Sequence, residues 1–435
     1  MGALRAAAGA VDLTPPAGTW MTGFALRTEP ATGVHDPLLA RALLLEDGGS
    51  RLVIISCDLL GLAPEAVAEV RQAIAEQRVA PAANVLLACT HTHSGPASMP
   101  MRGVLGYVDE TWLAEAKRKI VALVVGLPDR LSPACLAYAS TVVQGIGYNR
   151  QDRSHPVDEE LAALAVESPD GAAIATVINY ATHPVVLGPA NRQFSGDFPG
   201  AATRHLEQLR GGVGLFLQGA CGDVDPVLYR DRGWGKGSWA DVEEIGGRLA
   251  QAAAAALASA PRAGNVRLAV ATEEVVLPLD PPPAPETLAG WVAGWEAERE
   301  RKRAANDRAG ALAATAMLQW ASELRRAMED GRVPRALSAE VFVAAINDVR
   351  LVGFPFEAYT DIGLEIKAGL RPLPCLFVSY ANGLYGYCPT RWAKKQGGYG
   401  ADTACRWFGG MLTAVGYGAA EALVSRSVAL GRGLT

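Results

Sequence analysis

A short apolar run leads into two closely spaced histidines in the stretch Val85-Leu86-Leu87-Ala88-Cys89-Thr90-His91-Thr92-His93-Ser94-Gly95-Pro96. The run is uninterrupted and β-compatible, which predicts a buried strand, and the Gly-Pro pair predicts a loop after it. Residues two apart in extended backbone point to the same side, so we expect His91 and His93 to face one pocket. Such a pair suits a divalent transition metal. Two imidazoles packed in a hydrophilic loop are the alternative.

Helix-like and strand-like segments alternate on both sides of this stretch. Pro64, for example, opens a helix in which Val67, Val70 and Ile74 share one face. The expected strands cover residues 52–57, 85–89, 134–143, 173–180, 213–218, 340–346, 349–352 and 375–380. One expected helix begins at Pro64, and the others cover residues 111–125, 198–209, 241–258 and 356–367. This alternation predicts an α/β fold with a mixed β-sheet core flanked by helices.

One segment interrupts the alternation. The stiff connector Leu279-Asp280-Pro281-Pro282-Pro283 leads into Glu286–Asp330, which reads as one long helix or a helical hairpin. We interpret residues 285–330 as a helical insertion within a single catalytic domain of residues 1–435. It is expected to act as a lid or as a contact with a second subunit, so a homo-oligomer is an open alternative.

Composition limits the function classes. The net charge is −5 and no basic stripe stands out, which argues against nucleic-acid binding. No apolar run is long enough to span a membrane, and no N-terminal signal pattern is present. Seven scattered cysteines without a CxxC motif favour reduced thiols, and therefore a cytoplasmic location. The excess of Ala, Gly and Arg suggests a bacterial source.

Further candidate residues lie at predicted strand ends and in loops. His183 follows the strand 173–180, and Glu357 is expected in the first turn of the helix 356–367, where the helix dipole alone would explain it. Asp223 and Asp225 form a pair that can cap a turn, orient a histidine or hold a polar substrate group. Loop positions supply the remaining candidates, which are Arg150, Tyr385, Tyr387 and Tyr399.

Several common enzyme classes lose support. The chain has no GxSxG elbow, no Walker A loop and no GxGxxG fingerprint, which argues against α/β-hydrolase, P-loop and Rossmann chemistry. Ser94 and Cys221 are conceivable nucleophiles, but neither has a local signature.

The ordered set of motifs resembles the N-terminal catalytic domain of the neutral/alkaline non-lysosomal ceramidase family. The matching pieces span almost the entire chain, and the stretch Thr90-His91-Thr92-His93-Ser94-Gly95-Pro96 is the most specific. In order, the others are Val11–Pro16, Gly33–His35, Gly147–Arg150, Ala181–Pro184, Gly222–Val224, Glu357 and the late tyrosine loop. The chain is identified as a stand-alone bacterial member of that family.

The resemblance implies a zinc-dependent amidase that cleaves an N-acyl bond of a small or lipid-like substrate. By motif, one Zn²⁺ ion would be held by His91, His183, Glu357 and Tyr387. The active-site residues that the family carries over are His93, Arg150 and Tyr399. The Tyr387 assignment rests on aligning Asn382–Thr390 with the family's Asn-x-Tyr-x-x-Tyr-x-x-Thr stretch, and a second family tyrosine twelve residues later falls on Tyr399.

The chemistry of these residues agrees with such a reaction. Two imidazoles and one carboxylate are the usual strong ligands of a catalytic zinc, which lowers the pKa of its water to about 7. His93 is expected to move a proton, and Tyr399 to donate to the developing oxyanion. Asp58 is expected to orient a histidine ligand.

The chain departs from the family at one position. Ceramidases carry serine in Gly-Asp-Val-Ser-Pro, and Asp225 stands there, so an acceptor-only carboxylate replaces a hydroxyl. We therefore expect Asp225 to pair with an amine or hydroxyls of a smaller acyl-amide than ceramide. The alternatives are an esterase or lactonase that uses the same metal site, and a non-catalytic, ceramidase-like binding protein.

Overall fold

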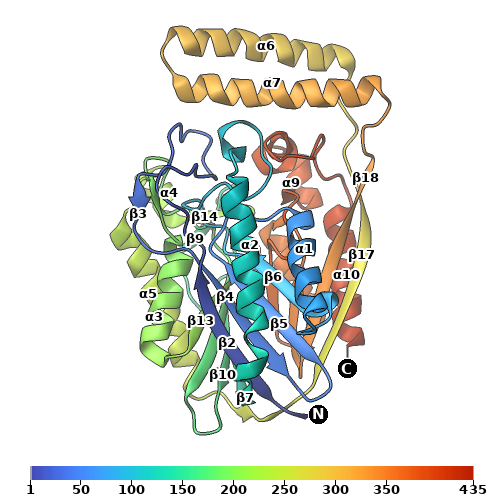
Figure 1. Cartoon of the computed structure of the whole chain (residues 1–435). Helices are drawn as coiled ribbons and strands as arrows, with labels where there is room; N and C mark the ends of the chain where they lie inside the picture. The colour runs from blue at the N-terminus through green and yellow to red at the C-terminus, as the bar shows by residue number, and fades with distance from the viewer. Residues whose placement is uncertain (1, 435) are drawn as a thin grey trace.

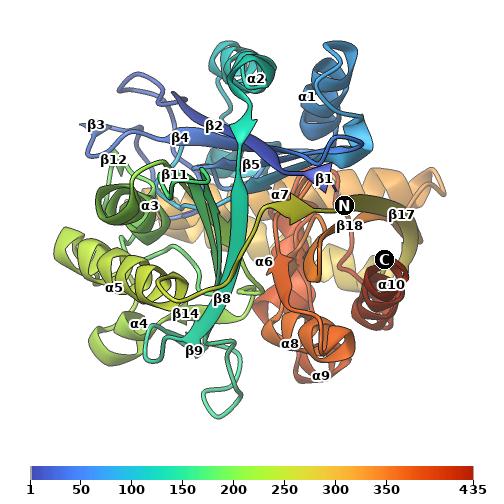
Figure 2. The same ribbon diagram turned by 90° about the horizontal axis from the view of Figure 1, so that it is seen from below.

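Three mixed β-sheets meet at the centre of the fold, and each carries helices on its outer face (Figures 1 and 2). The structure, a computed structural model, describes residues 2–434. This arrangement confirms the predicted α/β class with a mixed-sheet core flanked by helices.

The first sheet contains the strand that precedes the two histidines. Its strands, in spatial order, are β6 (Val85–Cys89), β5 (Arg51–Cys57), β4 (Leu39–Glu46), β2 (Arg5–Asp12) and β7 (Ser132–Pro133). Helices α1 (Pro64–Glu76) and α2 (Glu110–Val125) cover its outer face. The α2 N-terminus is capped because the Asp109 side chain accepts a hydrogen bond from the Trp112 backbone N–H.

The second sheet lies beside the first. Its strands, in spatial order, are β13 (Val213–Gln218), β11 (Ala173–Tyr180), β10 (Glu160–Glu167), β8 (Cys135–Val142) and β15 (Arg262–Ala263). Helices α3 (Asp197–Arg210) and α5 (Trp239–Leu257) pack on its outer face. A capping box of Ser238 and Asp241 begins α5.

The third sheet comes from the second half of the chain. Its strands, in spatial order, are β17 (Leu268–Pro278), β18 (Ala336–Ile346), β19 (Val349–Gly353) and β21 (Cys375–Val378). Helices α8 (Thr360–Leu370) and α10 (Ala419–Gly433) cover it.

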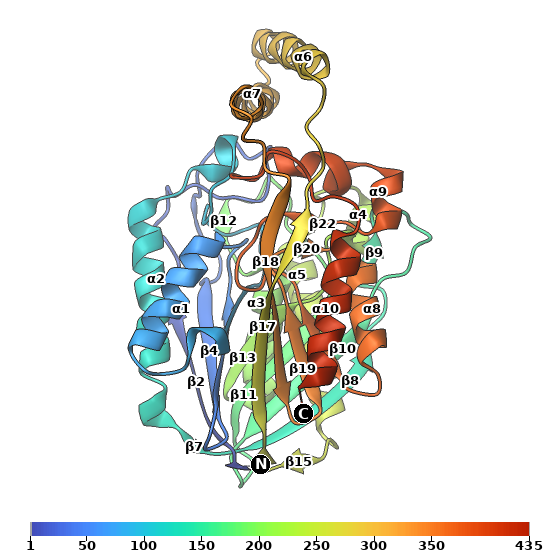
Figure 3. The ribbon, with the colours of Figure 1, turned by 90° about the vertical axis from the view of Figure 1, so that its right-hand side faces the viewer.

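A helical hairpin extends from the tip of the third sheet. It consists of α6 (Pro285–Ala304) and α7 (Arg308–Glu329), which pack side by side above the body (Figure 3). The β17–β18 pairing continues to Pro278 opposite Ala336, so the hairpin leaves and rejoins the sheet at neighbouring positions. The helical insertion expected near residues 285–330 is therefore present as a hairpin.

The remaining elements are short. They are β1 (Gly2–Ala3), β3 (Gly33–Val34), β9 (Gly147–Asn149), β12 (Gln193–Phe194), β14 (Val224–Pro226), β16 (Asn265–Val266), β20 (Glu357–Ala358), β22 (Tyr387–Cys388), α4 (Val227–Arg232) and α9 (Arg391–Gln396), with five further single turns. Between Gly2 and Leu434, no helix is both long and apolar enough to cross a bilayer.

The inner faces of the three sheets share one apolar core, and each sheet contributes one parallel strand pair. The core side chains include Ile54, Leu86, Leu164, Val177, Phe342 and Leu376. The parallel pairs are β5–β6, β11–β13 and β19–β21.

The carboxyl ends of these pairs are joined by hydrogen bonds. The Cys89 N–H donates to the Tyr380 carbonyl over 3.2 Å, and the Ser379 N–H donates to the Gln218 carbonyl over 2.9 Å. Ligand sites form where the carboxyl ends of parallel strands meet. This fold has one such meeting point for all three sheets.

Candidate metal centre and active site

His91 lies just beyond β6, and its ring is fixed on two sides. Its Nδ1 is 2.7 Å from the Leu60 carbonyl, which can only accept, so Nδ1 carries the proton and Nε2 keeps a free lone pair. Tyr380 stacks on the ring at 4.0 Å. The expectation of extended backbone is wrong, because β6 ends at Cys89 and His91 has φ +67°, a left-handed conformation that is uncommon outside glycine.

His183 reaches the same point from the second sheet, three residues after β11. Its Nδ1 is 2.6 Å from the Cys221 carbonyl, which again leaves Nε2 as the free acceptor. Burial lowers the pKa of His183, and the cationic Arg150 lowers that pKa further. Both effects favour the neutral imidazole, which is the form that binds metals, whereas the nearby Glu357 opposes them.

Glu357 follows the third sheet, four residues after the end of β19. The expectation that it lies in a first helical turn is wrong: it belongs to the short strand β20, and α8 begins only at Thr360. β20 pairs in parallel with β22, which places Glu357 opposite Tyr387. A Cβ on Gly222 would come within 2.6 Å of the Glu357 carbonyl, so the loop that carries Cys221 packs against this strand only because residue 222 is glycine.

Three buried atoms of these residues converge. Glu357 Oε2 is 3.3 Å from His91 Nε2 and 3.3 Å from His183 Nε2, and all three side chains are about 2 % exposed or less. Ligand atoms about 2.0–2.1 Å from a tetrahedral zinc lie about 3.3 Å from one another. Within residues 2–434, neither Glu357 Oε2 nor His183 Nε2 has a partner in hydrogen-bond geometry. The residues present therefore fit a divalent cation.

The electrostatics of Glu357 favour an anionic ligand. Burial opposes its ionisation, but the adjacent His91 and His183 outweigh burial and hold the pKa of the carboxyl below its usual range. An ionised carboxylate between two imidazoles is an arrangement that a cation stabilises.

His93 lies at the edge of this cluster. Its Nε2 is 3.2 Å from His91 Nε2, and the three histidines form a group that can hold a metal ion. Arg27 donates to the His93 carbonyl over 3.1 Å, and the Phe24 ring packs edge-on at 5.0 Å. Burial and the two neighbouring imidazoles lower the pKa of His93 well below its usual value, which leaves it neutral.

Tyr387, Arg150 and Asp225 form a polar chain beside the cluster. Arg150 Nη2 donates to the Tyr387 hydroxyl over 2.8 Å, and Arg150 Nη1 lies 3.2 Å from Asp225 Oδ1. Burial raises the pKa of Tyr387, and the Arg150 guanidinium opposes that rise. Asp225 is thus held by a cation of the protein itself.

Tyr399 lies on the solvent side of Tyr387. Its ring packs edge-on at 5.7 Å from the Tyr387 ring, and the residue is 50 % exposed. The backbone before it bends at Gly397 and Gly398, which both have positive φ.

Neither Asp223 nor Asp58 orients a histidine ligand, although the sequence left that role open for both. Asp223 accepts hydrogen bonds from Asn149 and from the backbone and hydroxyl of Thr360, so it joins β9 to the start of α8 instead of orienting a histidine. Asp58 pairs with Arg41 at 2.8 Å, and backbone carbonyls orient the histidines instead. The expectation that Asp58 fixes a histidine tautomer is therefore wrong.

Sequence reasoning missed the aromatic surroundings of the cluster. Tyr380 stacks on His91, and its hydroxyl is 3.2 Å from Cys221 Sγ. On the other side, Trp234 packs edge-on against Phe24 at 5.6 Å and is 51 % exposed. The only signal for Trp234 is its place between two glycines, Gly233 and Gly235, which predicts an exposed loop tip.

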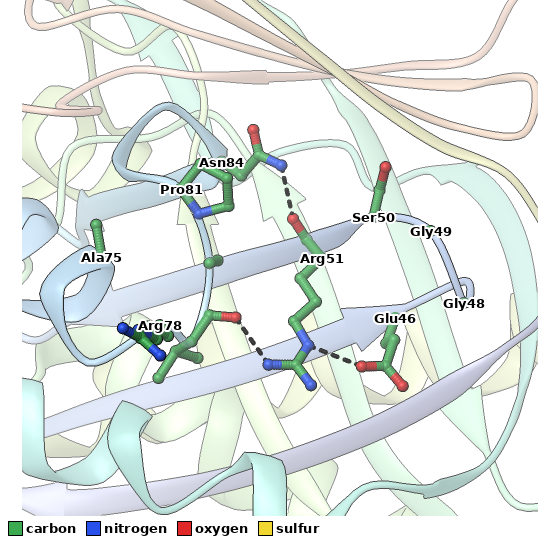
Figure 4. Close-up of a pocket in the computed structure, with 11 residues that line it drawn as sticks. Glu46, Gly48, Gly49, Ser50, Arg51, Ala75, Arg78, Pro81 and Asn84 are labelled. Carbon is green, nitrogen blue, oxygen red and sulfur yellow. Dashed lines mark hydrogen bonds and ion pairs between the residues drawn. The ribbon is translucent and has the colours of Figure 1, made fainter.

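A hollow of about 620 Å³ lies at the other end of the first sheet (Figure 4). Its main charged group, Arg51, donates to Glu46 over 2.7 Å and to the Val79 carbonyl over 3.1 Å. Asn84 donates to the Arg51 carbonyl. These polar groups are satisfied by one another, in contrast to the unpaired atoms of the histidine cluster.

Comparisons with known proteins agree with this geometry. The family model described as neutral/alkaline non-lysosomal ceramidase, N-terminal, matches residues 5–243. The neutral ceramidase of Pseudomonas aeruginosa is 29% identical over 253 residues, which cover 52% of this chain and 38% of that protein. Neutral ceramidase B of Dictyostelium discoideum is 28% identical over 50% of this chain and 35% of that protein. The matched part thus spans less than half the length of these relatives.

Solved structures match over the whole chain. The crystal structure of neutral ceramidase from Pseudomonas aeruginosa matches with a TM-score of 0.73 and 20% identity, covering 100% of this chain and 75% of that one. A ceramidase complexed with C2 matches with a TM-score of 0.74 and 20% identity, covering 100% of this chain and 76% of that one. These likenesses show a shared fold. With more than half of its residues matched by the family model, the chain belongs to the neutral/alkaline non-lysosomal ceramidase family.

Proposed function

We propose that this chain is a zinc-dependent hydrolase that uses water to cleave an N-acyl amide bond of a small or lipid-like substrate. The observation that carries the proposal is that Glu357 Oε2 lies 3.3 Å from both His91 Nε2 and His183 Nε2, with each of these residues two to four positions after a strand of a different sheet. Membership of the ceramidase family supports an amide bond as the target.

One zinc ion would be held by His91, His183 and Glu357, with the Tyr387 phenol as a fourth and weaker ligand. When bound, zinc supplies a Lewis acid for the acyl carbonyl and lowers the pKa of a coordinated water to about 7. The carbonyls of Leu60 and Cys221 orient the two imidazoles for this task.

The remaining polar residues handle protons and developing charge. His93, neutral and next to the cluster, takes a proton from the attacking water and returns it to the leaving nitrogen. Tyr399 donates a hydrogen bond to the oxyanion that forms on the acyl carbonyl. Arg150 holds the Tyr387 hydroxyl in place and pairs with Asp225.

The surroundings of the site suggest the substrate class. Phe24 and the half-exposed Trp234 form an aromatic path from His93 to the surface, which suits an apolar acyl group. Asp225 provides an acceptor for an amine or hydroxyls on the other half of the substrate.

We further propose that residues 1–435 act as a single catalytic domain and that the protein works in the cytoplasm. All seven cysteines lie within the described residues and are free thiols, which suits a reducing compartment.

Metal analysis together with matched substrates tests the proposal. The purified protein is expected to hold about one zinc per chain, to lose activity on chelation and to regain it at about one equivalent of zinc. Paired amide and ester substrates with the same acyl group are expected to show hydrolysis of the amide. Hydrolysis of the ester alone would favour an esterase, and failure to bind zinc would favour a binding protein.

A substitution at Asp225 tests the substrate class. Hydrolysis of N-acyl substrates with cationic and with neutral amine halves is compared for the wild type and Asp225→Ser. Loss of the carboxylate is expected to shift preference away from the cationic substrate by about tenfold. An unchanged preference would contradict a role for Asp225 in recognising the amine.

A further inference from the structure

The α6–α7 hairpin stands above the end of the body at which the three sheets meet (Figures 1 and 3). It is inserted between two paired strand ends, because the Leu279 N–H donates to the Arg335 carbonyl over 3.0 Å directly below it. Its base faces the segment of residues 397–412, which carries Tyr399. We call these residues the Tyr399 segment.

A buried arginine ties the hairpin to this segment. Arg102, about 1% exposed, donates from Nε and Nη2 to Glu323 Oε2 of α7, at 3.0 and 2.6 Å. The same guanidinium donates to the carbonyls of Cys405, Arg406, Phe408 and Met411, all in the Tyr399 segment. A buried guanidinium is costly without an anionic partner, so Glu323 stabilises the whole network.

Three tryptophans form a second attachment. The guanidinium carbon of Arg406 lies 4.6, 5.5 and 4.8 Å from the ring centres of Trp291, Trp295 and Trp320, which come from both helices. The Trp320 Nε1–H donates to the Leu412 carbonyl over 2.9 Å. The hairpin therefore holds the Tyr399 segment at several points between residues 405 and 412.

The held residues connect directly to the candidate site. The backbone carbonyl of Phe408 accepts a hydrogen bond from Arg102, and the ring of the same residue packs edge-on against the Tyr387 ring at 6.4 Å. Tyr399 lies earlier in the same segment and begins the turn Tyr399–Thr403, in which the Asp402 N–H donates to the Gly398 carbonyl. Because Tyr399 is half exposed and preceded by two glycines, its own packing provides little to fix it.

We propose that the α6–α7 hairpin is a clamp that positions Tyr399, and the Tyr387 side of the centre, through Arg102, Glu323 and Arg406. Arg102 and Glu323 are positioning residues in this scheme, and the hairpin acts as a fixed strut. The effect on catalysis rests on the proposed function, whereas the effect on the backbone of the Tyr399 segment does not.

A single charge removal provides the first test. In Glu323→Gln, amide hydrogen exchange in residues 397–412 is expected to rise about tenfold while exchange in β6 and β11 stays constant. For an N-acyl amide substrate, kcat is expected to fall about tenfold with zinc content unchanged, because the positioning of the two tyrosines is loosened while His91, His183 and Glu357 are untouched. Glu329→Gln on the same helix is the matched control, since its contact with Arg325 is exposed.

Excision of the hairpin provides the second test. Because β17 and β18 are paired up to its base, Leu279 can be joined to Arg335 through an Asn-Gly turn. Zinc is expected to stay at about one ion per chain, because His91, His183 and Glu357 lie outside the excised residues. Exchange in residues 397–412 is expected to rise more than in Glu323→Gln.

The outcomes separate the clamp from the proposed function. Unchanged exchange in the Tyr399 segment of both variants would overturn the clamp, even with a fully active enzyme. Loss of zinc on excision would also overturn it, because the hairpin would then support the whole centre. If the wild type cleaves no N-acyl amide, the proposed function fails. The exchange measurement still tests whether the hairpin holds the Tyr399 segment in place.

Discussion

The two halves of the chain supply the candidate site in different ways. Residues 5–243, the part that the family model matches, carry all three histidines of the cluster together with Arg150 and Asp225. Residues beyond 243 carry Glu357, Tyr387, Tyr399 and the hairpin, and they resemble solved ceramidases in fold. The comparison shows that the first half supplies the histidines together with Phe24, Trp234 and Asp225, while the second half adds Glu357 and the two tyrosines.

The largest expected effect tests whether the second half supplies a metal ligand. Glu357→Gln and His183→Ala, one from each half, are each expected to lose bound zinc and at least about 10³-fold in kcat/KM, because each removes a strong ligand. Metal analysis and kinetics measure both. His155→Ala is the control, since His155 pairs with Asp361 and stacks on Trp392. A Glu357→Gln variant that keeps its zinc would restrict the centre to the first half.

A prediction of intermediate size tests whether the first half also determines which acyl chains the enzyme prefers. Trp234→Ala is expected to lower kcat/KM about tenfold for long acyl chains and little for short ones, because the indole offers apolar surface. Trp234→Phe should restore most of the loss. Val142→Ala, at another exposed apolar position, serves as the control. An equal loss for every chain length would mean that Trp234 only supports Phe24.

The last prediction concerns stability, where no effect on catalysis is expected, and it belongs to the first half alone. Burial raises the pKa of Asp197, at the start of α3, to about 7, and the nearby Asp36 adds to the rise while backbone N–H donors oppose it. The native state then holds a proton that the unfolded chain has lost, so stability falls as pH rises from about 4 to about 7 and levels off above. One proton corresponds to at most about 1.4 kcal/mol per pH unit.

Urea unfolding across this pH range measures the slope. Asp197→Asn, which does not titrate, is expected to flatten it, and zinc content is expected to stay the same. A slope equal to that of the wild type would assign the proton to another group.

Much of the fold follows from local sequence, and the exceptions have physical causes. The uninterrupted apolar run Val85–Cys89 predicts a buried strand, and all five residues of β6 are buried in the structure. The Ala-rich run Arg5–Asp12 carries no such signal, since alanine has low strand propensity, and it becomes β2 by pairing with the leucines of β4. The segment Glu286–Asp330 is predicted to be helical, and the structure adds that its tryptophans at 291, 295 and 320 surround Arg406.

The candidate site was predictable in its residue types and less so in its geometry. The motifs identify His91, His183 and Glu357, which the structure brings together. The strand β20 depends on pairing with Tyr387, thirty residues later, so local periodicity indicates a helix there instead. The stacking of Tyr380 on His91 and the two orienting carbonyls are long-range contacts that no local pattern encodes.

One candidate ligand follows a strand of each of the three large sheets, and this arrangement has a thermodynamic consequence. A cation that binds only the native arrangement is linked to the unfolding of the whole chain, because no single sheet can separate without dismantling its coordination. Each tenfold increase in free zinc above the dissociation constant would add about 1.4 kcal/mol to global stability. The ion would stabilise the native fold as well as take part in catalysis, and the melting temperature would report how much of the protein has bound zinc.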